Sequence, residues 1–280
     1  MLSYKHAFHS GNHADVLKHV LLLETVHQFK QKNKPFCVFD THAGAGVYSY
    51  DDAEVLKNRE FETGVALLKN DQSLADGIIR YQTLIEQFGR NKQLPGSPVL
   101  IAESLREEDE LTLFELHASE ADKLKRLAEL SNANIHHRDG FEGIVGLTPP
   151  KIRRGMVIID PPYELLDEYQ KVVSTVSQVL HKWPNACILV WYPLLTKRAK
   201  AKSGQSEKML QKLAPLAKSG VFKAELSIAS KNAEVGMYGS GMLGINPPWQ
   251  LYTAVSDIIE QLHHMLNATD TNLEWLVPPT

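Results

Sequence analysis

The sequence predicts a doubly wound α/β fold, in which a mostly parallel sheet carries helices on both faces. Short apolar runs rich in β-branched and aromatic residues occur at 36–39, 111–114, 156–159 and 187–191. Helix-length amphipathic segments separate these runs, and this alternation is typical of parallel sheets that are covered on both sides. The chain has 280 residues, of which 43% are hydrophobic, so it can form a globular domain with a large core.

The remaining elements follow from the same patterns of apolar residues and turn residues. A weaker strand precedes the third of these apolar runs, and an antiparallel pair closes the sheet, which brings the prediction to seven strands. The expected strands lie at 36–39, 111–114, 134–137, 156–159, 187–191, 221–229 and 241–246. The expected helices lie at 13–30, 74–89, 98–106, 119–130, 164–182, 205–219 and 250–266.

The spacing between the first two strands is unusual. About 70 residues separate them, whereas a simple strand-helix-strand unit needs only about 30. The acidic segment between them contains helical patterns and ends at Pro95-Gly96, and Ser97-Pro98 then forms a good helix start. We therefore predict a small helical subdomain at 47–97, inserted into a single domain made of residues 1–46 and 98–280.

The charge is nearly balanced overall but unevenly distributed. The chain contains 30 Lys and Arg residues against 33 Asp and Glu residues, which argues against binding nucleic acid by bulk positive charge. Residues 51–120 contain 7 basic and 15 acidic side chains, whereas residues 151–215 contain 11 basic and 5 acidic ones. The basic series is either a solvated helix face or a phosphate-contacting patch. Its members include Lys197, Arg198, Lys200, Lys202, Lys208 and Lys212.

The lengths of the apolar runs and the positions of the two cysteines indicate the protein's compartment and its redox chemistry. No run reaches the roughly 18 apolar residues of a spanning helix, and the N-terminus has no apolar signal-peptide core, so we expect a cytoplasmic protein that is not in a membrane. Cys37 and Cys187 each lie in an apolar run, which favours reduced, buried thiols over a disulfide or a metal site.

A glycine-containing loop, residues 40–46 with the sequence DTHAGAG, follows the first strand. Its small residues let a ligand approach the backbone and present amide groups near a helix start. The loop is not a dinucleotide fingerprint, because Ser49 stands where the third glycine would be, and no Gly-Lys-Ser/Thr of a P-loop follows. Its D-x-x-x-G-x-G pattern resembles the cofactor loop of class I S-adenosylmethionine-dependent methyltransferases, although a purely structural turn has the same composition.

The motif Asp160-Pro161-Pro162-Tyr163 follows the fourth strand. The exocyclic amine of adenine is a poor nucleophile, and a carboxylate that accepts one of its hydrogens localises the lone pair. The prolines fix an extended backbone and leave a carbonyl free for the second hydrogen, while the tyrosine ring can stack on the base. The motif resembles motif IV of amino-methyltransferases; the alternative is a simple strand terminator. The similar Asn246-Pro247-Pro248-Trp249 follows the last strand and is interpreted as a turn.

With the motifs in this order, the chain resembles the RlmJ family, which forms N6-methyladenosine in 23S ribosomal RNA. The resemblance extends from residue 3 to residue 249 and keeps the family order. Besides the two motifs above, it rests on the opening S-Y-K-H-x-F-H-x-G-N-H-A-D-V-L-K-H at 3–19 and on PGSP at 95–98, ELH at 115–117, DGF at 139–141, RRG at 153–155, WYP at 191–193 and GM through NPPW at 241–249.

The resemblance implies a class I Rossmann-like methyltransferase fold, S-adenosylmethionine as cofactor and a set of site residues. Asp160, Pro161, Pro162 and Tyr163 would be catalytic. Tyr4, Lys5 and His6, in an N-terminal arm at 1–30, would contact the RNA. Glu115 could accept both ribose hydroxyls and Asp139 the adenine amine of the cofactor. The implied cofactor-binding residues are Lys18, His19, Asp40, His42, Gly44, Gly46, Ser97, Glu115, Asp139, Gly140 and Asp160.

Six of the 12 histidines lie in the first 42 residues, which raises the question of a metal site. The neighbourhood lacks cysteine and offers few carboxylates, so we expect no bound metal. A core or hydrogen-bonding role is the alternative for each histidine, and the resemblance favours cofactor contact for His19 and His42.

The sequence therefore predicts a methyltransferase that modifies the N6 atom of a flipped-out adenine in 23S ribosomal RNA. We expect it to act as a monomer on RNA that is protein-free or early in assembly. Two alternatives stay open. A DNA adenine methyltransferase shares the Asp-Pro-Pro-Tyr motif, although no target-recognition domain is recognisable here. A non-catalytic RNA-binding protein on the same scaffold is the other alternative.

Overall fold

The computed structural model of the chain describes residues 6–68, 71 and 73–279. Among these residues the main sheet has eight strands in the order β10-β8-β9-β7-β6-β1-β4-β5, so the predicted seven is one too few. The strands are β1 (Cys37–Asp40), β4 (Glu110–Glu115), β5 (Asn134–His137), β6 (Gly155–Ile159), β7 (Cys187–Leu195), β8 (Val221–Ser227), β9 (Met237–Ile245) and β10 (Asp270–Val277).

The eighth strand, β10, was missed because it lies at the edge of the sheet and none of its residues is fully buried. It pairs antiparallel with β8, and Trp275 on it stacks on Tyr252 with ring centroids 4.5 Å apart. A half-exposed edge strand lacks the continuous apolar run that marks a central strand. β1, β4, β5, β6 and β7 run parallel, whereas β9 is antiparallel to β7 and β8.

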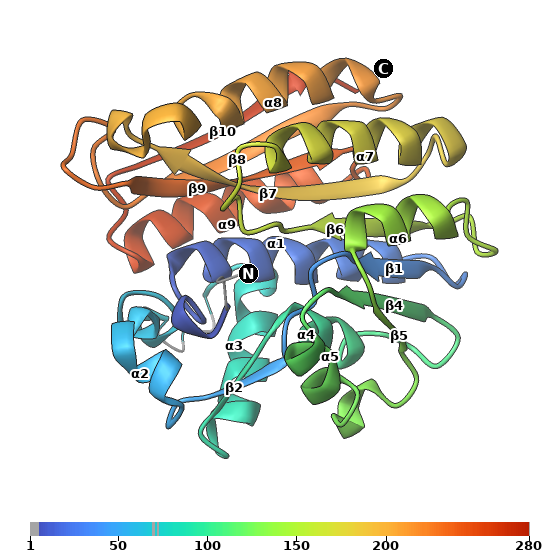
Figure 1. Cartoon of the computed structure of the whole chain (residues 1–280), viewed down its shortest axis with the longest axis horizontal. Coiled ribbons are helices and arrows are strands. Elements are labelled where there is room, and N and C mark those ends of the chain that lie inside the picture. The colour runs from blue at the N-terminus through green and yellow to red at the C-terminus, as the bar shows by residue number, and fades with distance from the viewer. Residues whose placement is uncertain (1–5, 69–70, 72, 280) are drawn as a thin grey trace.

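Helices cover both faces of the sheet, as predicted (Figure 1). One core cluster joins the sheet to α1, α3, α4 and α9, and the other joins it to α6, α7 and α8. The helices are α1 (His13–Lys30), α2 (Ala53–Asn58), α3 (Asp76–Gly89), α4 (Ser97–Ala102), α5 (Ala118–Leu124), α6 (Gly140–Leu147), α7 (Glu168–Lys182), α8 (Gln205–Leu213) and α9 (Leu251–Met265).

Helix α1 lies deep in the molecule. Only His27, Gln28 and Lys30 of its residues are not buried. Its apolar residues, which contact α3, α4 and α9, explain why an N-terminal helix can be enclosed on all sides. The helix also buries charged and polar side chains, among them Asp15, Lys18 and His19. Because a buried charge is stable only when it is paired, this cluster points to a functional site at the start of α1.

The segment 47–97 contains α2, α3, short 3-10 turns and a two-stranded ribbon of β2 (Val47–Ser49) and β3 (Gln93–Pro95). Figure 1 shows α2, in light blue, near the start of α1. The contacts are close: the backbone N–H of Val65 donates to the carbonyl of Gly11 at 2.9 Å. A Cβ at Gly64 would lie 2.0 Å from that same carbonyl oxygen, so only glycine permits this approach.

The carboxyl ends of β1, β4, β5 and β6 meet at one edge of the sheet, since parallel strands all point the same way. The register places Asp40 of β1 opposite Leu113 of β4 and Ile158 of β6. The glycine-containing loop, Glu115 and the Asp160 motif are therefore brought to this edge, which is where open α/β sheets bind their ligands.

Candidate active site

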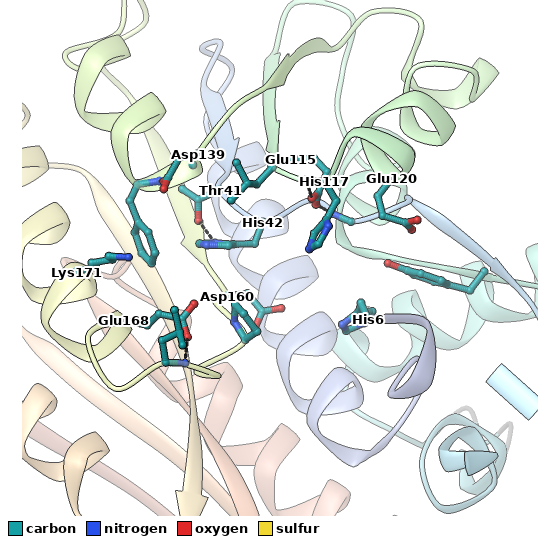
Figure 2. A pocket seen from close by; sticks show the side chains of 17 residues that line it. His6, Thr41, His42, Glu115, His117, Glu120, Asp139, Asp160, Glu168 and Lys171 are labelled. Carbon is teal, nitrogen blue, oxygen red and sulfur yellow. Dashed lines mark hydrogen bonds between the residues drawn. The ribbon is translucent and has the colours of Figure 1, made fainter. Parts of the chain in front are cut away.

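A cleft with a volume of about 970 Å³, open mouth included, lies at this edge of the sheet. Its size suits a small organic ligand or cofactor. Figure 2 shows His42, Glu115, Asp139 and Asp160, which come from four different connections, directed around one space. The cleft is lined by His6, Thr41, His42, Gly44, Tyr48, Glu115, Leu116, His117, Glu120, Asp139, Gly140, Phe141, Asp160, Pro162, Leu165, Glu168 and Lys171.

Two acidic side chains that line this cleft, Glu115 and Asp139, are held by backbone amides. The Glu115 carboxylate accepts hydrogen bonds from the N–H of Gly44 at 2.8 Å and of His117 at 2.7 Å. The Asp139 carboxylate caps α6 by accepting from the N–H of Phe141 at 2.7 Å. Both carboxylates are thereby fixed in position while they still line the cleft, as acceptors for hydroxyl or amine hydrogens of a ligand.

The glycine-containing loop is shaped by left-handed glycines and by a buried carboxylate. Gly44 has φ 64° and Gly46 has φ 81°, conformations that favour glycine. Asp40 is completely buried and accepts hydrogen bonds from Ser97 Oγ at 2.7 Å and from the His42 N–H at 3.1 Å. Burial raises the pKa of Asp40 to about 6 despite these hydrogen bonds. Asp40 therefore supports the loop from below and does not line the cleft.

Gly140 is needed for packing as well as lining the cleft. A Cβ at Gly140 would lie 1.9 Å from the carbonyl oxygen of Thr41, so the glycine lets α6 pack against the loop after β1. Its backbone still lines the cleft. The contact fixes the distance between the Asp139 turn and the His42 turn.

Asp160 is paired with a lysine that precedes it by 142 residues. Lys18 Nζ donates to Asp160 Oδ2 at 2.5 Å and to Asp15 Oδ1 at 2.8 Å. Burial would lower the pKa of Lys18, but the two carboxylates outweigh it and raise the pKa. Asp15 also accepts from His6 Nε2 at 2.9 Å and from the Gly11 N–H at 2.8 Å. The sequence-predicted cofactor residue Lys18 thus fixes the Asp160 carboxylate.

His19 and His42 lie with Lys18, Ser97 and Asp160 around a smaller cavity, of about 210 Å³ with its mouth, next to the main cleft. Burial lowers the pKa of His19 to about 3 and that of His42 to about 4, so both rings are neutral. His19 Nδ1 lies 3.3 Å from Tyr81 Oη, but His19 Nε2 has no hydrogen-bond partner among the described residues. A buried ring nitrogen without a partner is satisfied by a bound ligand or water.

A second cleft, of about 1030 Å³ with its mouth, lies on the other side of Asp160. It shares His6, Asp160 and Pro162 with the first cleft. The two clefts therefore meet at the Asp160 carboxylate, which is the arrangement that a transfer between two bound molecules needs. Its other lining residues are His9, Asn12, Ala14, Asp15, Lys18, Tyr163, Trp191, Pro193, Leu195, Ala199, Lys202, Gly236 and Met237.

Tyr163 borders the second cleft, but most of its ring lies in the core. Its side chain is 3% exposed, its ring centroid lies 4.5 Å from that of Tyr169, and its hydroxyl donates to the Trp191 carbonyl at 2.8 Å. Tyr163 also has φ 48°, a strained value for a residue with a side chain. The strained turn directs the ring into the core, so a base cannot stack over the full ring face in this conformation.

Of the residues expected to contact RNA, Tyr4 and Lys5 lie outside the described residues. His6 lines both clefts, and its ring centroid lies 5.4 Å from that of Tyr48. The turn that carries His6 is held by the segment 47–97. Glu60 accepts hydrogen bonds from His9 Nδ1 at 3.0 Å and from Asn12 Nδ2 at 2.9 Å.

Sequence reasoning missed three contributors to this site. Asp15 lies at the centre of the buried charge network, and its spacing of three residues from Lys18 on an apolar helix was a usable signal. Trp191 lies in the WYP motif of the resemblance but was given no role. Glu60 had no signal, because its role depends on contacts with a segment that is distant in the sequence.

Among the described residues no group of three or more His, Cys, Asp or Glu side chains could hold a metal ion. The described helices also include none that could cross a membrane.

Comparison with known proteins agrees with this geometry. The family model described as "Ribosomal RNA large subunit methyltransferase D, RlmJ" matches residues 33–277. Ribosomal RNA large subunit methyltransferase J of Escherichia coli K12 is 35% identical over 99% of this chain and 100% of its own length. The protein of the same name from Haemophilus influenzae is also 35% identical, with the same coverage.

A crystal structure of a Legionella pneumophila protein superposes with a TM-score of 0.85 at 29% identity, covering 96% of this chain and 98% of that one. The similarity therefore extends over almost the whole of this chain. By the family match over most of its length and by its full-length relatives, the chain belongs to the RlmJ family of ribosomal RNA large subunit methyltransferases.

Proposed function

We propose that this protein transfers a methyl group from S-adenosylmethionine to the exocyclic N6 of an adenine in 23S ribosomal RNA. The observation that carries the proposal is the meeting of two clefts at Asp160, one with carboxylates suited to a nucleoside cofactor and one with apolar walls suited to a base. Membership of the RlmJ family agrees with this activity.

The residues present fit the cofactor. Glu115 offers acceptors for ribose hydroxyls, and Asp139 offers an acceptor for an adenine amine. The smaller cavity beside His19, whose Nε2 lies 3.8 Å from Asp15 Oδ1 and has no hydrogen-bond partner among the described residues, suits the polar amino-acid end of the molecule. His42 and Ser97 border the same cavity, and Gly44 and Gly46 give the loop its shape. When bound, S-adenosylmethionine supplies a methyl group on a positively charged sulfur, which is the electrophile of the reaction.

The chain's own residues prepare the amine. Asp160 accepts one N6 hydrogen, and a main-chain carbonyl of the Pro161-Pro162 turn accepts the other, so the nitrogen lone pair is directed out of the ring. Lys18 holds Asp160 Oδ2, which leaves Oδ1 for the amine and fixes the carboxylate against rotation. With the cofactor bound, formation of the bond from N6 to the methyl carbon would break that carbon's bond to sulfur and release a neutral thioether. The nitrogen would become positively charged and would then lose a proton to Asp160 or to water.

We further propose that the segment at 47–97 is an insertion that holds the N-terminal arm, residues 1–30, against the rest of the domain formed by 1–46 and 98–280. The contacts of Glu60 and of Val65 with residues 9–12 support this role.

We also propose that a monomer in the cytoplasm acts on protein-free or early-assembly RNA. The described residues of one chain line both clefts, and a base can flip into a cleft only where no other protein covers it.

Methyl transfer from labelled cofactor to protein-free 23S ribosomal RNA tests the proposal, with 16S ribosomal RNA and duplex DNA as substrate controls. Nucleoside analysis should identify N6-methyladenosine in the 23S sample alone. Asp160→Asn should abolish transfer while cofactor affinity is kept. Asp167→Asn is the matched control, because Asp167 is an exposed carboxylate in the same connection, and it should leave the rate unchanged. A different methylated nucleoside, or full activity of Asp160→Asn, would overturn the proposal.

A further inference from the structure

The basic stretch after β7 contains cations that the described part of the molecule leaves unpaired. Arg198 is paired with Glu234 at 2.8 Å. In contrast, no ion pair or hydrogen bond to a described residue involves the side chains of Lys197, Lys200, Lys202 or Lys208. The only acidic residue between 196 and 212 is Glu207, which lies 4.0 Å from Lys231. This surface therefore carries positive charge without compensation.

Among these four lysines, Lys202 is the one that lines the second cleft. It is half-buried, whereas Lys197, Lys200 and Lys208 are exposed. Its cleft also contains Asp160, Trp191 and Met237, so a positive charge and apolar walls face the same space. That combination suits a nucleotide, since the base needs apolar contact and the backbone phosphate needs a cation.

The turn that carries Lys202 is fixed to the sheet and is not a free loop. Thr196 Oγ1 donates to the Val235 carbonyl at 2.5 Å and accepts from the Arg198 N–H at 3.1 Å. The Thr196 N–H donates to the Gly236 carbonyl at 3.0 Å, and Ser206 Oγ donates to the Pro193 carbonyl at 2.7 Å. Because the turn is bonded at one end to the residues just before β9 and at the other end to β7, Lys202 is held at the rim of the cleft before RNA arrives.

We propose that Lys202 binds the RNA backbone phosphate next to the adenine held at Asp160, and so helps to position the target strand. This inference rests on the proposed function for the identity of the polymer. Lys197, Lys200 and Lys208 do not line this cleft, so the proposed contact is specific to Lys202.

The size of the effect follows from counterion release. A single phosphate contact on single-stranded RNA contributes a slope of about −0.7 to the plot of log affinity against log salt concentration. At 0.1 M monovalent salt, one such contact corresponds to about a fivefold change in affinity. Lys202→Ala should therefore bind protein-free 23S ribosomal RNA about fivefold more weakly at 0.1 M salt, with a salt slope smaller by about 0.7.

Controls separate this contact from a general loss of charge or of folding. Lys202→Arg should keep the wild-type affinity and slope, because it keeps the charge. Lys182→Ala removes one exposed lysine whose Nζ bonds the Val145 carbonyl at 2.8 Å, away from either cleft, and should bind RNA as wild type does. All three variants should bind S-adenosylmethionine with unchanged affinity.

The inference is overturned if Lys202→Ala keeps the wild-type salt slope and affinity, or if Lys182→Ala loses as much affinity as Lys202→Ala. Failure of the proposed function gives a different result. In that case the wild-type protein transfers no methyl group to 23S ribosomal RNA, whatever the RNA-binding titrations of the variants give.

Discussion

Replacing Gly140 with alanine tests the idea that this glycine is needed for packing of α6 on the loop after β1. The new Cβ would lie 1.9 Å from the Thr41 carbonyl oxygen, whereas ordinary contacts begin at 3.4 Å. The neighbour is backbone, so it cannot rotate away. The loop and α6 must move apart by roughly 1.5 Å, and the loop carries His42 into the cofactor cleft.

The free-energy change has two parts. Overpacking against a fixed backbone group costs about 3 kcal/mol, at the upper end of the usual range. Replacing glycine by alanine in a helix interior returns about 1 kcal/mol, which is an upper limit here because Gly140 is the first residue of α6. We expect a net loss of about 2 kcal/mol in the free energy of unfolding, which lowers the urea midpoint by about 1 M for an m-value of about 2 kcal/mol/M. Affinity for S-adenosylmethionine should fall as well.

The same helix provides a matched control. Gly146 also belongs to α6, but a Cβ there would meet no atom within 4 Å. Gly146→Ala should therefore raise the free energy of unfolding by up to about 1 kcal/mol and leave cofactor affinity unchanged. Urea titration and isothermal calorimetry measure both quantities. If Gly140→Ala is as stable as wild type and binds the cofactor normally, the packing argument is wrong.

Three further outcomes follow from the site. Lys18→Met leaves Asp15 and Asp160 without their shared cation, so we expect the free energy of unfolding to fall by about 3–5 kcal/mol in a urea titration. A fall of less than about 1 kcal/mol would contradict the buried pairing. Tyr163→Phe removes the hydrogen bond to the Trp191 carbonyl and should cost about 1–2 kcal/mol, and a raised KM for RNA with unchanged stability would instead favour a stacking role. The free energy of unfolding should fall as the pH drops from 6.5 toward 4. Burial lowers the pKa values of several histidines, so the unfolded chain binds more protons than the folded chain in that window. His19→Gln should reduce the slope, and a stability profile that is flat between these pH values would refute the reasoning. The histidines concerned are His13, His19 and His42.

The strands and the ligand-binding edge of the sheet could be predicted because their signals are local. Apolar runs mark the central strands, and the residues that follow each run must lie at its carboxyl end. Asp160 follows a predicted strand, and the resemblance to a known family implied roles for Glu115 and Asp139; the cleft contains all three. The β10 strand lacked such a signal, because a half-exposed edge strand is not a continuous apolar run.

The sequence by itself determined the α/β order of elements, the interruption after the first strand and the residues available at the strand ends, since covalent neighbours and periodicity decide these features. Only the tertiary structure decided that Lys18 holds Asp160, that Gly140 packs against Thr41 and that Tyr163 turns into the core. Those contacts join segments that are far apart in the sequence. Their geometry depends on how whole helices and loops pack, and no local pattern of residues encodes that packing.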